Sequence, residues 1–275
     1  MNKYEKEQYK AIIKWKEKKP SVMSRLTGRA LKPLSWTVER VIPPRAIQGA
    51  LTGADWIAQG LTDTEDIKRD GKVNQISELR HKDLQLSDKL ANEVHNWANG
   101  IALAEGAATG ASGLPGMAVD IPALITMCLR AIHKIGLCYG YECKTQSDKQ
   151  LVYGILSVAG ANNVHEKVVA LANIQAIKVI IAKNTWKKIA EKAATKTASG
   201  EALVITIKNL AKQLGVNLTK RKALQAIPLV GAGVGAAMNV SFVTDVAWAA
   251  RRTFQEMWLQ ENGLIIEPEV IEPCE

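Results

Sequence analysis

The sequence predicts an all-α protein, a multi-helix bundle whose core is formed by two Gly/Ala-rich helical hairpins. Apolar residues recur at spacings of three and four over long stretches, which is typical of amphipathic helices. Signals for β-strands are few, and glycine and alanine gather in two regions of the chain. With 275 residues and 47% hydrophobic content, the chain is long enough for one large helical domain or two that share a core.

Residues 1–44 are predicted to form a basic amphipathic N-terminal helix followed by a proline-rich strap. The helical pattern runs from Asn2 to Lys19 and ends before Pro20. Its basic side consists of Lys3, Lys6, Lys10 and Lys14, with Tyr9, Ile12 and Ile13 roughly opposite. Three further prolines, Pro33, Pro43 and Pro44, break the strap into short pieces.

Charge is distributed unevenly along the chain. Residues 1–50 contain 12 Lys plus Arg and four Glu, so a net charge of +8 out of +9 lies in the first fifth. This asymmetry indicates contact with an anionic partner, either a membrane surface or nucleic acid, although a solvated basic helix gives the same pattern. The basic residues are not interleaved with stacking aromatic residues, so we expect no nucleic acid. Trp15 could lie in a lipid interface or dock on the protein body.

Residues 45–262 are predicted to form the helical domain, and residues 263–275 a flexible tail. The first glycine-rich stretch contains Gly106 and Gly110, whose spacing permits close helix approach. We expect a turn near residues 113–116 and a new helix from about Asp120, with Asp120 as its N-cap. The apolar seam of that helix is expected to comprise Ile121, Leu124 or Ile125, Cys128, Ile132, Ile135 and Tyr139, with Arg130 off the seam.

The second glycine-rich stretch, from Lys220 to Trp258, is the most distinctive part of the chain. Gly215 is predicted to end the preceding helix, with Thr219 as the next N-cap. The 22 residues from Ala223 to Thr244 carry no charge, which satisfies the length criterion for a membrane span. Eight of these residues are Gly or Ala, and a proline and an asparagine add cost, so we favour a soluble helical body that contacts a membrane through its arm and hairpins.

The final helix shows two distinct sides. The apolar seam is expected to comprise Val240, Val243, Ala247, Ala250, Phe254 and Met257. The other side carries Asp245, Trp248 and Arg252. Asp245 lies in mid-helix and cannot act as a cap, so we hypothesise that it pairs with an arginine where the two hairpins meet.

These residues resemble the EcsC family of bacterial proteins. The resemblance rests on Leu218–Pro228 with its glycine-rich continuation, Phe242-x-x-Asp245 followed by Ala249–Phe254, and Gly106–Pro122 with Tyr139-Gly140-Tyr141. It covers most of the chain, least characteristically residues 162–200. The family takes its name from a locus that also encodes an ABC transporter. The resemblance implies a helical cytosolic or membrane-peripheral protein, and it carries over no catalytic residue.

Motifs of common enzyme classes are absent from the sequence. The chain has neither the phosphate-binding Gly-x-x-x-x-Gly-Lys-Ser/Thr pattern nor a dinucleotide-binding glycine motif. The four histidines lack the spacing of helical metal sites, and the four cysteines are expected to be reduced thiols. Ser112 lacks the spacing of a nucleophile elbow. We therefore expect no metal and no cofactor.

Two functional readings remain open. The first is a non-enzymatic peripheral membrane protein that binds a lipid or other apolar ligand, in the cytoplasm at the inner face of the cell membrane. Its partners would be an anionic membrane surface or lipid, and a membrane transporter complex to which it could be accessory. The second is a lipid-directed hydrolase using Asp120, Ser112 or Asp245. Candidate ligand-binding residues are Asp120, Arg130, Asp245, Trp248 and Arg252, and candidate membrane-contact residues are Lys3, Lys6, Lys10, Lys14 and Trp15.

Overall fold

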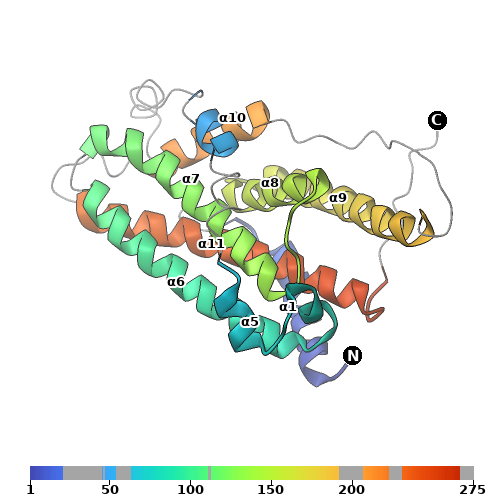
Figure 1. Ribbon diagram of the computed structural model, residues 1–275. Helices are drawn as coiled ribbons and strands as arrows, with labels where there is room; N and C mark the ends of the chain where they lie inside the picture. The colour runs from blue at the N-terminus through green and yellow to red at the C-terminus, as the bar shows by residue number, and fades with distance from the viewer. Residues whose placement is uncertain are drawn as a thin grey trace, which may run out of the picture.

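The computed structural model describes residues 1–20, 45, 47–53, 63–110, 113–191, 207–222 and 231–266, and over these residues the protein is all-helical (Figure 1). The described residues contain no strand, which confirms the predicted fold class. The helices are α1 (Lys3–Glu17), α5 (Glu65–Gly71), the 3-10 helix η1 (Ile76–His81), α6 (Leu84–Gly110), α7 (Gly113–Cys138), α8 (Gln146–Gly160), α9 (Val164–Glu191), α10 (Ile207–Lys222) and α11 (Gly231–Glu261).

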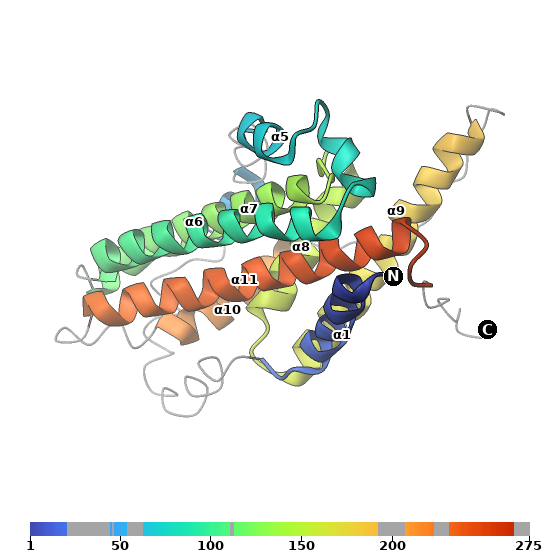
Figure 2. The same cartoon turned by 90° about the horizontal axis from the view of Figure 1, so that it is seen from below.

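Three long helices, α6, α7 and α11, form the centre of the bundle. The two helices α6 and α11 pack along each other, and α7 packs against both (Figures 1 and 2). Helix α8 lies against α11 and α9, while α9 extends outward from the body, as Figure 2 shows. Helix α1 crosses the C-terminal half of α11 and also contacts α6.

Helices α6 and α11 approach each other closely at two glycines. A Cβ atom placed on Gly106 would lie 2.7 Å from the carbonyl oxygen of Gly235 and 2.8 Å from the Cα of Ala236. Only a hydrogen fits in that space, so the backbones of the two helices touch directly. The two glycine-rich stretches of the sequence therefore meet in space.

The predicted hairpin arrangement of the second stretch is not confirmed: α10 packs mainly against α8, and α11 packs mainly against α6. Helix α10 also continues through Gly215 and Thr219 to Lys222, so neither residue has its predicted role at a helix end. A Cβ atom on Gly215 would lie 3.0 Å from the Cδ1 atom of Ile47. Gly215 therefore leaves room for the side chain of Ile47 to pack against the middle of α10.

The start of α7 also differs from the prediction. The helix begins at Gly113, seven residues before Asp120, so Asp120 is not an N-cap. Pro115 lies in the first turn, where backbone N–H groups have no intrahelical partner, and it therefore does not interrupt the helix. The predicted apolar seam of α7 is confirmed, since all its members are completely buried.

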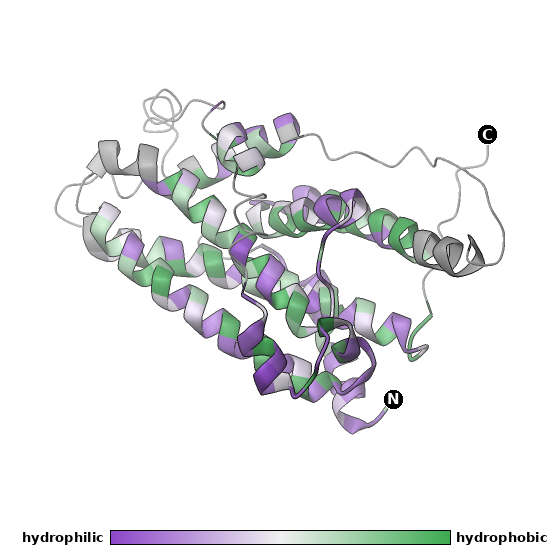
Figure 3. Ribbon diagram, in the orientation of Figure 1, coloured by the Kyte–Doolittle hydropathy of each residue, from purple (hydrophilic) through white to green (hydrophobic). Residues whose placement is uncertain are grey.

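The apolar seam of α11 is confirmed as well, with five of its six members buried and Val240 partly buried against the core. Figure 3 shows hydrophobic residues distributed along all the central helices. Among the described residues, Asp120–Cys138 is long and apolar enough to cross a membrane, and 72% of it is buried inside the protein, as in the core helix of a soluble protein. Of the predicted charge-free segment, residues 223–230 lie outside the described residues.

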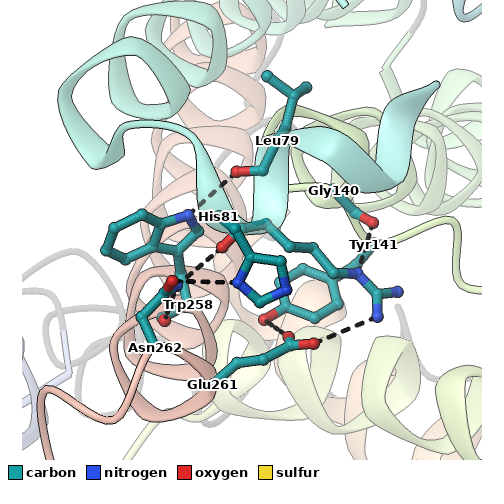
Figure 4. Close-up of polar contacts among 8 residues, drawn as sticks. Leu79, His81, Gly140, Tyr141, Trp258, Glu261 and Asn262 are labelled. Carbon is teal, nitrogen blue, oxygen red and sulfur yellow. Dashed lines mark hydrogen bonds and ion pairs between the residues drawn. The ribbon is translucent and has the colours of Figure 1, made fainter. Parts of the chain in front are cut away.

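A polar junction joins η1, the end of α7 and the end of α11 (Figure 4). The Arg80 Nε donates to the carbonyl oxygen of Gly140 at 2.9 Å, and the hydroxyl of Tyr141 donates to Glu261 at 2.8 Å. Gly140 has φ of 91°, and a Cβ atom there would lie 2.5 Å from the Cγ atom of Arg80. This turn therefore requires glycine.

The end of α11 extends the packed body past residue 262. Gly263 adopts φ of 66°, and the N–H of Leu264 donates to the carbonyl oxygen of Leu259, which is a glycine-based helix C-cap. Leu264 and Ile265 pack against the core, so the predicted flexible tail does not begin at residue 263. The strap at residues 21–44 and the tail from residue 267 lie outside the described residues.

We expect Gly106→Ala to lower the free energy of unfolding by about 1–3 kcal/mol, because the added methyl group would force α6 and α11 apart. Gly100→Ala on the same helix is the matched control, since a Cβ atom there meets nothing within 4 Å. That change should stabilise the protein by about 0.5–1 kcal/mol through helix propensity. Urea denaturation of both variants measures the difference, and equal effects would contradict the direct backbone contact.

Candidate functional site

Helix α1 has one face in solvent and one face on the protein body. Asn2 caps it through a reciprocal pair of hydrogen bonds with Glu5. The four predicted membrane-contact lysines, Lys3, Lys6, Lys10 and Lys14, are all exposed. On the inner face, Ile12 is completely buried. The amphipathic pattern of the sequence therefore predicted the outward side of the lysines, but it placed Ile13 on the opposite side, whereas Ile13 is 41% exposed.

Side-chain hydrogen bonds and an ion pair attach α1 to α6 and α11. The hydroxyl of Tyr4 donates to Asp88 on α6 at 2.6 Å. The Oε1 atom of Gln8 accepts from Arg252 on α11 at 3.0 Å, and Lys16 donates to Glu256 on α11 at 2.5 Å. These contacts follow the inner face of α1 along most of its length.

Asp88 is the centre of a buried polar cluster beneath α1. Its carboxylate is 4% exposed and accepts hydrogen bonds from Tyr4, from Tyr139 at 2.5 Å and from Gln255 at 2.5 Å. Burial raises the pKa of both tyrosines well above the ordinary value, and their hydrogen bonds to Asp88 raise the pKa further. Both hydroxyls therefore remain protonated donors, which a buried carboxylate needs.

Next to Asp88, two arginines of α11 surround an indole. The guanidinium carbons of Arg251 and Arg252 lie 4.5 and 4.9 Å from the centre of the Trp248 ring, and His95 contacts that ring edge-on at 5.6 Å. Arg251 donates to Asn92 at 3.1 Å. Such cation–π contacts stabilise arginines that burial has removed from water.

A second charged group lies deeper, between α1, α9 and α11. Glu256 pairs with Lys178 at 2.9 Å and with Lys16. Burial alone would raise the pKa of Glu256, but the ammonium groups of Lys178 and Lys16 outweigh that effect and lower it. Lys178 is 2% exposed, and the carboxylate of Glu256 offsets the cost of burying its ammonium group.

Lys167 on α9 holds the C-terminal end of α1. Its ammonium group donates to the carbonyl oxygens of Trp15 at 2.6 Å and Lys18 at 2.5 Å, and it lies 5.0 Å from the centre of the Trp15 ring. Burial, with a smaller effect from Lys18, lowers the pKa of Lys167 to about 8. Trp15 is half-buried against this lysine, so its indole docks on the protein body. Of the two positions predicted for Trp15, a lipid interface or the protein body, the structure has the second.

The predicted ligand-binding residues fall into separate places. Trp248 and Arg252 lie together in the Asp88 cluster. Arg130 lies 5.0 Å from the centre of the Trp97 ring. Trp97 and His95 point to opposite sides of α6, because two residues correspond to about 200° of helix. Arg130 is therefore on a different side of α6 from the cluster that His95 contacts. Asp245 is half-buried near Lys167. Its carboxylate offsets part of the lowering of the Lys167 pKa that burial causes. Pairing of Asp245 with an arginine remains a prediction.

Asp120 lies near the glycine crossing, at the other end of the bundle from α1. It is 1% exposed and accepts hydrogen bonds from Thr109 at 2.8 Å and from Asn239 at 3.0 Å. Asn239 precedes Asp245 by six residues, about 9 Å along α11 and about 120° around it. Asp120 and Asp245 therefore do not form one catalytic pair, and Ser112 lies outside the described residues.

The sequence analysis missed Asp88, Tyr4, Gln8 and Gln255. Their signal is weak, because each is a polar residue on a helix that could equally face solvent. The buried state of Asp88 follows only from the convergence of donors on α1, on α11 and on Tyr139, which follows α7. Among the described residues, no group of three or more His, Cys, Asp or Glu side chains could hold a metal ion.

Burial of His95 makes the stability of the protein depend on pH. Burial, with a smaller effect from the charge of Arg251, lowers the pKa of His95 from 6.5 to about 4. Between these values the unfolded chain binds a proton that the folded chain does not, so stability falls as the pH is lowered through this range. In His95→Gln, the melting temperature should depend less steeply on pH there. His165→Gln, which alters an exposed histidine, should keep the wild-type slope; a wild-type slope in His95→Gln would refute the assignment.

Comparison with known proteins places this architecture in a family. The protein described as "Uncharacterized protein YdbA" from Bacillus subtilis (strain 168) is 24% identical over 189 residues, which cover 68% of this chain and 63% of that protein. The chain therefore matches less than two thirds of the length of this relative. No solved structure is detectably similar. The model of the EcsC protein family matches residues 6–259, from within α1 almost to the end of α11. The chain belongs to the EcsC protein family.

Proposed function

We propose that this protein is a non-enzymatic, peripheral membrane protein that binds the anionic inner face of the cell membrane through the outer face of α1. The observation that carries the proposal is the exposure of every predicted membrane-contact lysine on one side of a docked, well-capped helix. Anionic lipid headgroups attract clustered lysines at a membrane surface, by about 1 kcal/mol per residue.

The composition of the outer face supports this binding mode. Six lysines of α1 and its C-terminal end are exposed, against two exposed glutamates, and they are Lys3, Lys6, Lys10, Lys14, Lys18 and Lys19. Ile13 lies among them and is 41% exposed, which gives this face one apolar side chain able to enter the interface. The attraction is electrostatic and should weaken as salt concentration rises.

The way α1 is attached to the body also supports the proposal. Polar side chains make most of its specific contacts; Ile12 is its fully buried apolar side chain, and Tyr4, Tyr9 and Trp15 pack partly against the core. A membrane surface can offer hydrogen-bond and charge partners of the same kind. The hydrogen bonds and ion pairs that hold α1 could therefore be exchanged for polar groups of a membrane surface.

No observation favours the hydrolase reading over this one. The buried carboxylate of Asp120 is bonded to Thr109 and Asn239, and Asp245 lies on another side of α11. Accessory association with a membrane transporter complex is part of the proposal, and it rests on the family resemblance. Vesicles of pure lipid separate binding to lipid from association with a transporter, because they contain no transporter.

The test is flotation with phosphatidylcholine vesicles that contain or lack phosphatidylglycerol. Replacing Lys3, Lys6, Lys10 and Lys14 by Gln should weaken binding to the anionic vesicles by about a thousandfold at low salt, from about 1 kcal/mol per lysine. The matched control replaces four exposed lysines elsewhere, Lys89, Lys144, Lys208 and Lys212, and has the same net charge. Equal losses in the two variants, or equal binding to uncharged vesicles, would refute the proposal.

A further inference from the structure

The guanidinium groups of Arg251 and Arg252 are held by weak partners. Arg251 donates to the side-chain oxygen of Asn92 and, at 3.5 Å, to the backbone oxygen of Asp88. Arg252 donates to the side-chain oxygens of Gln8 and Gln255. Within the described part of the chain, neutral oxygens make all the hydrogen bonds to these two groups. Guanidinium groups pair preferentially with carboxylate and phosphate oxygens, which can accept two parallel N–H donors at once.

The cluster also has an excess of positive charge. Two guanidinium groups are present with one carboxylate, that of Asp88, which is already occupied by two tyrosine hydroxyls and by Gln255. Arg251 is only 7% exposed, and its Nε atom has no hydrogen-bond partner. A buried positive charge that lacks an opposite charge is costly, and a bound anion would remove that cost.

One oxygen atom of α1 lies next to hydrogen-bond donors of two side chains of α11. The Oε1 atom of Gln8 accepts from Arg252 at 3.0 Å and lies 3.4 Å from the Nε2 atom of Gln255. Two donors from α11 thus converge on a single oxygen supplied by α1. If α1 moves away, Arg252 and Gln255 lose this acceptor together.

We infer that Trp248, Arg251, Arg252 and Gln255 form a binding site for a phosphate group, and that Gln8 of α1 closes it. Arginine is well suited to phosphate because its planar donors match the phosphate oxygens. The Trp248 ring holds both guanidinium groups near the site in the closed state. The inference rests on the proposed function only in naming a lipid headgroup, rather than free phosphate, as the source.

The first arm of the test uses inorganic phosphate, compared with chloride at equal ionic strength. Phosphate should raise the melting temperature of the wild type, since a ligand that binds only the folded state stabilises it. Gln8→Ala should strengthen phosphate binding, measured by phosphorus NMR titration, because it frees Arg252 without altering α11. Arg252→Gln should weaken binding by about tenfold or more.

The matched control is Arg130→Gln, which removes another arginine that contacts a tryptophan, on a different face of the bundle. It should keep wild-type phosphate binding. Absence of a phosphate effect in both the wild type and Gln8→Ala would overturn the inference, and so would equal losses in Arg252→Gln and Arg130→Gln. The Gln8→Ala result keeps the inference testable if Arg252→Gln fails to fold.

The second arm identifies the source of the phosphate and separates this inference from the proposed function. Inorganic phosphate should compete with phosphatidic acid vesicles for the wild type if a lipid headgroup occupies the site. Lack of competition would exclude the headgroup as the source. The variant lacking the four lysines of α1 should lose vesicle binding yet keep phosphate binding. If the wild type binds vesicles but shows no binding of inorganic phosphate, this inference is refuted and the proposed function is not.

Discussion

A single buried carboxylate, that of Asp88, connects the N-terminal helix to the centre of the bundle. It lies on α6 and accepts hydrogen bonds from α1, from the residue that follows α7 and from α11. Burying a charge costs several kcal/mol unless donors surround it, so the donors from these elements offset the cost of burying Asp88. The attachment of α1, the positions of Arg251 and Arg252, and both proposals depend on this arrangement.

The bundle is held differently at its two ends. Near Gly106 and Gly235, α6 and α11 touch through their backbones, and nothing larger than hydrogen fits between them. About 27 Å away along α6, at Asp88, the same two helices are separated by polar side chains, which make the contact with α1. Close packing of small residues fixes the crossing of the helices, whereas hydrogen bonds fix the position of α1. A contact made by hydrogen bonds can be exchanged with a polar ligand more readily than one made by interlocked backbones.

The residues that suggested the family are explained by their positions. In Tyr139-Gly140-Tyr141, the first hydroxyl binds Asp88, the glycine allows Arg80 to approach, and the second hydroxyl binds Glu261. Both tyrosine rings stack against Phe254 of α11. Arg251 and Arg252, from the other quoted motif, lie beside the same cluster. These motifs therefore build one junction, and they indicate family membership without indicating a reaction.

The sequence by itself determined the helical class, the apolar seams of α7 and α11, and the exposed lysine face of α1, because periodicity within a helix fixes which residues share a side. It could not place helix ends within glycine-rich segments, so Asp120 and Thr219 were assigned to caps although both lie inside helices. The site was predicted in part: Trp248 and Arg252 lie together, while Arg130 and Asp120 lie elsewhere. Only the tertiary structure decided that Asp88 is buried, because a polar residue on a helix surface becomes a core residue only when side chains distant in sequence supply its hydrogen-bond donors.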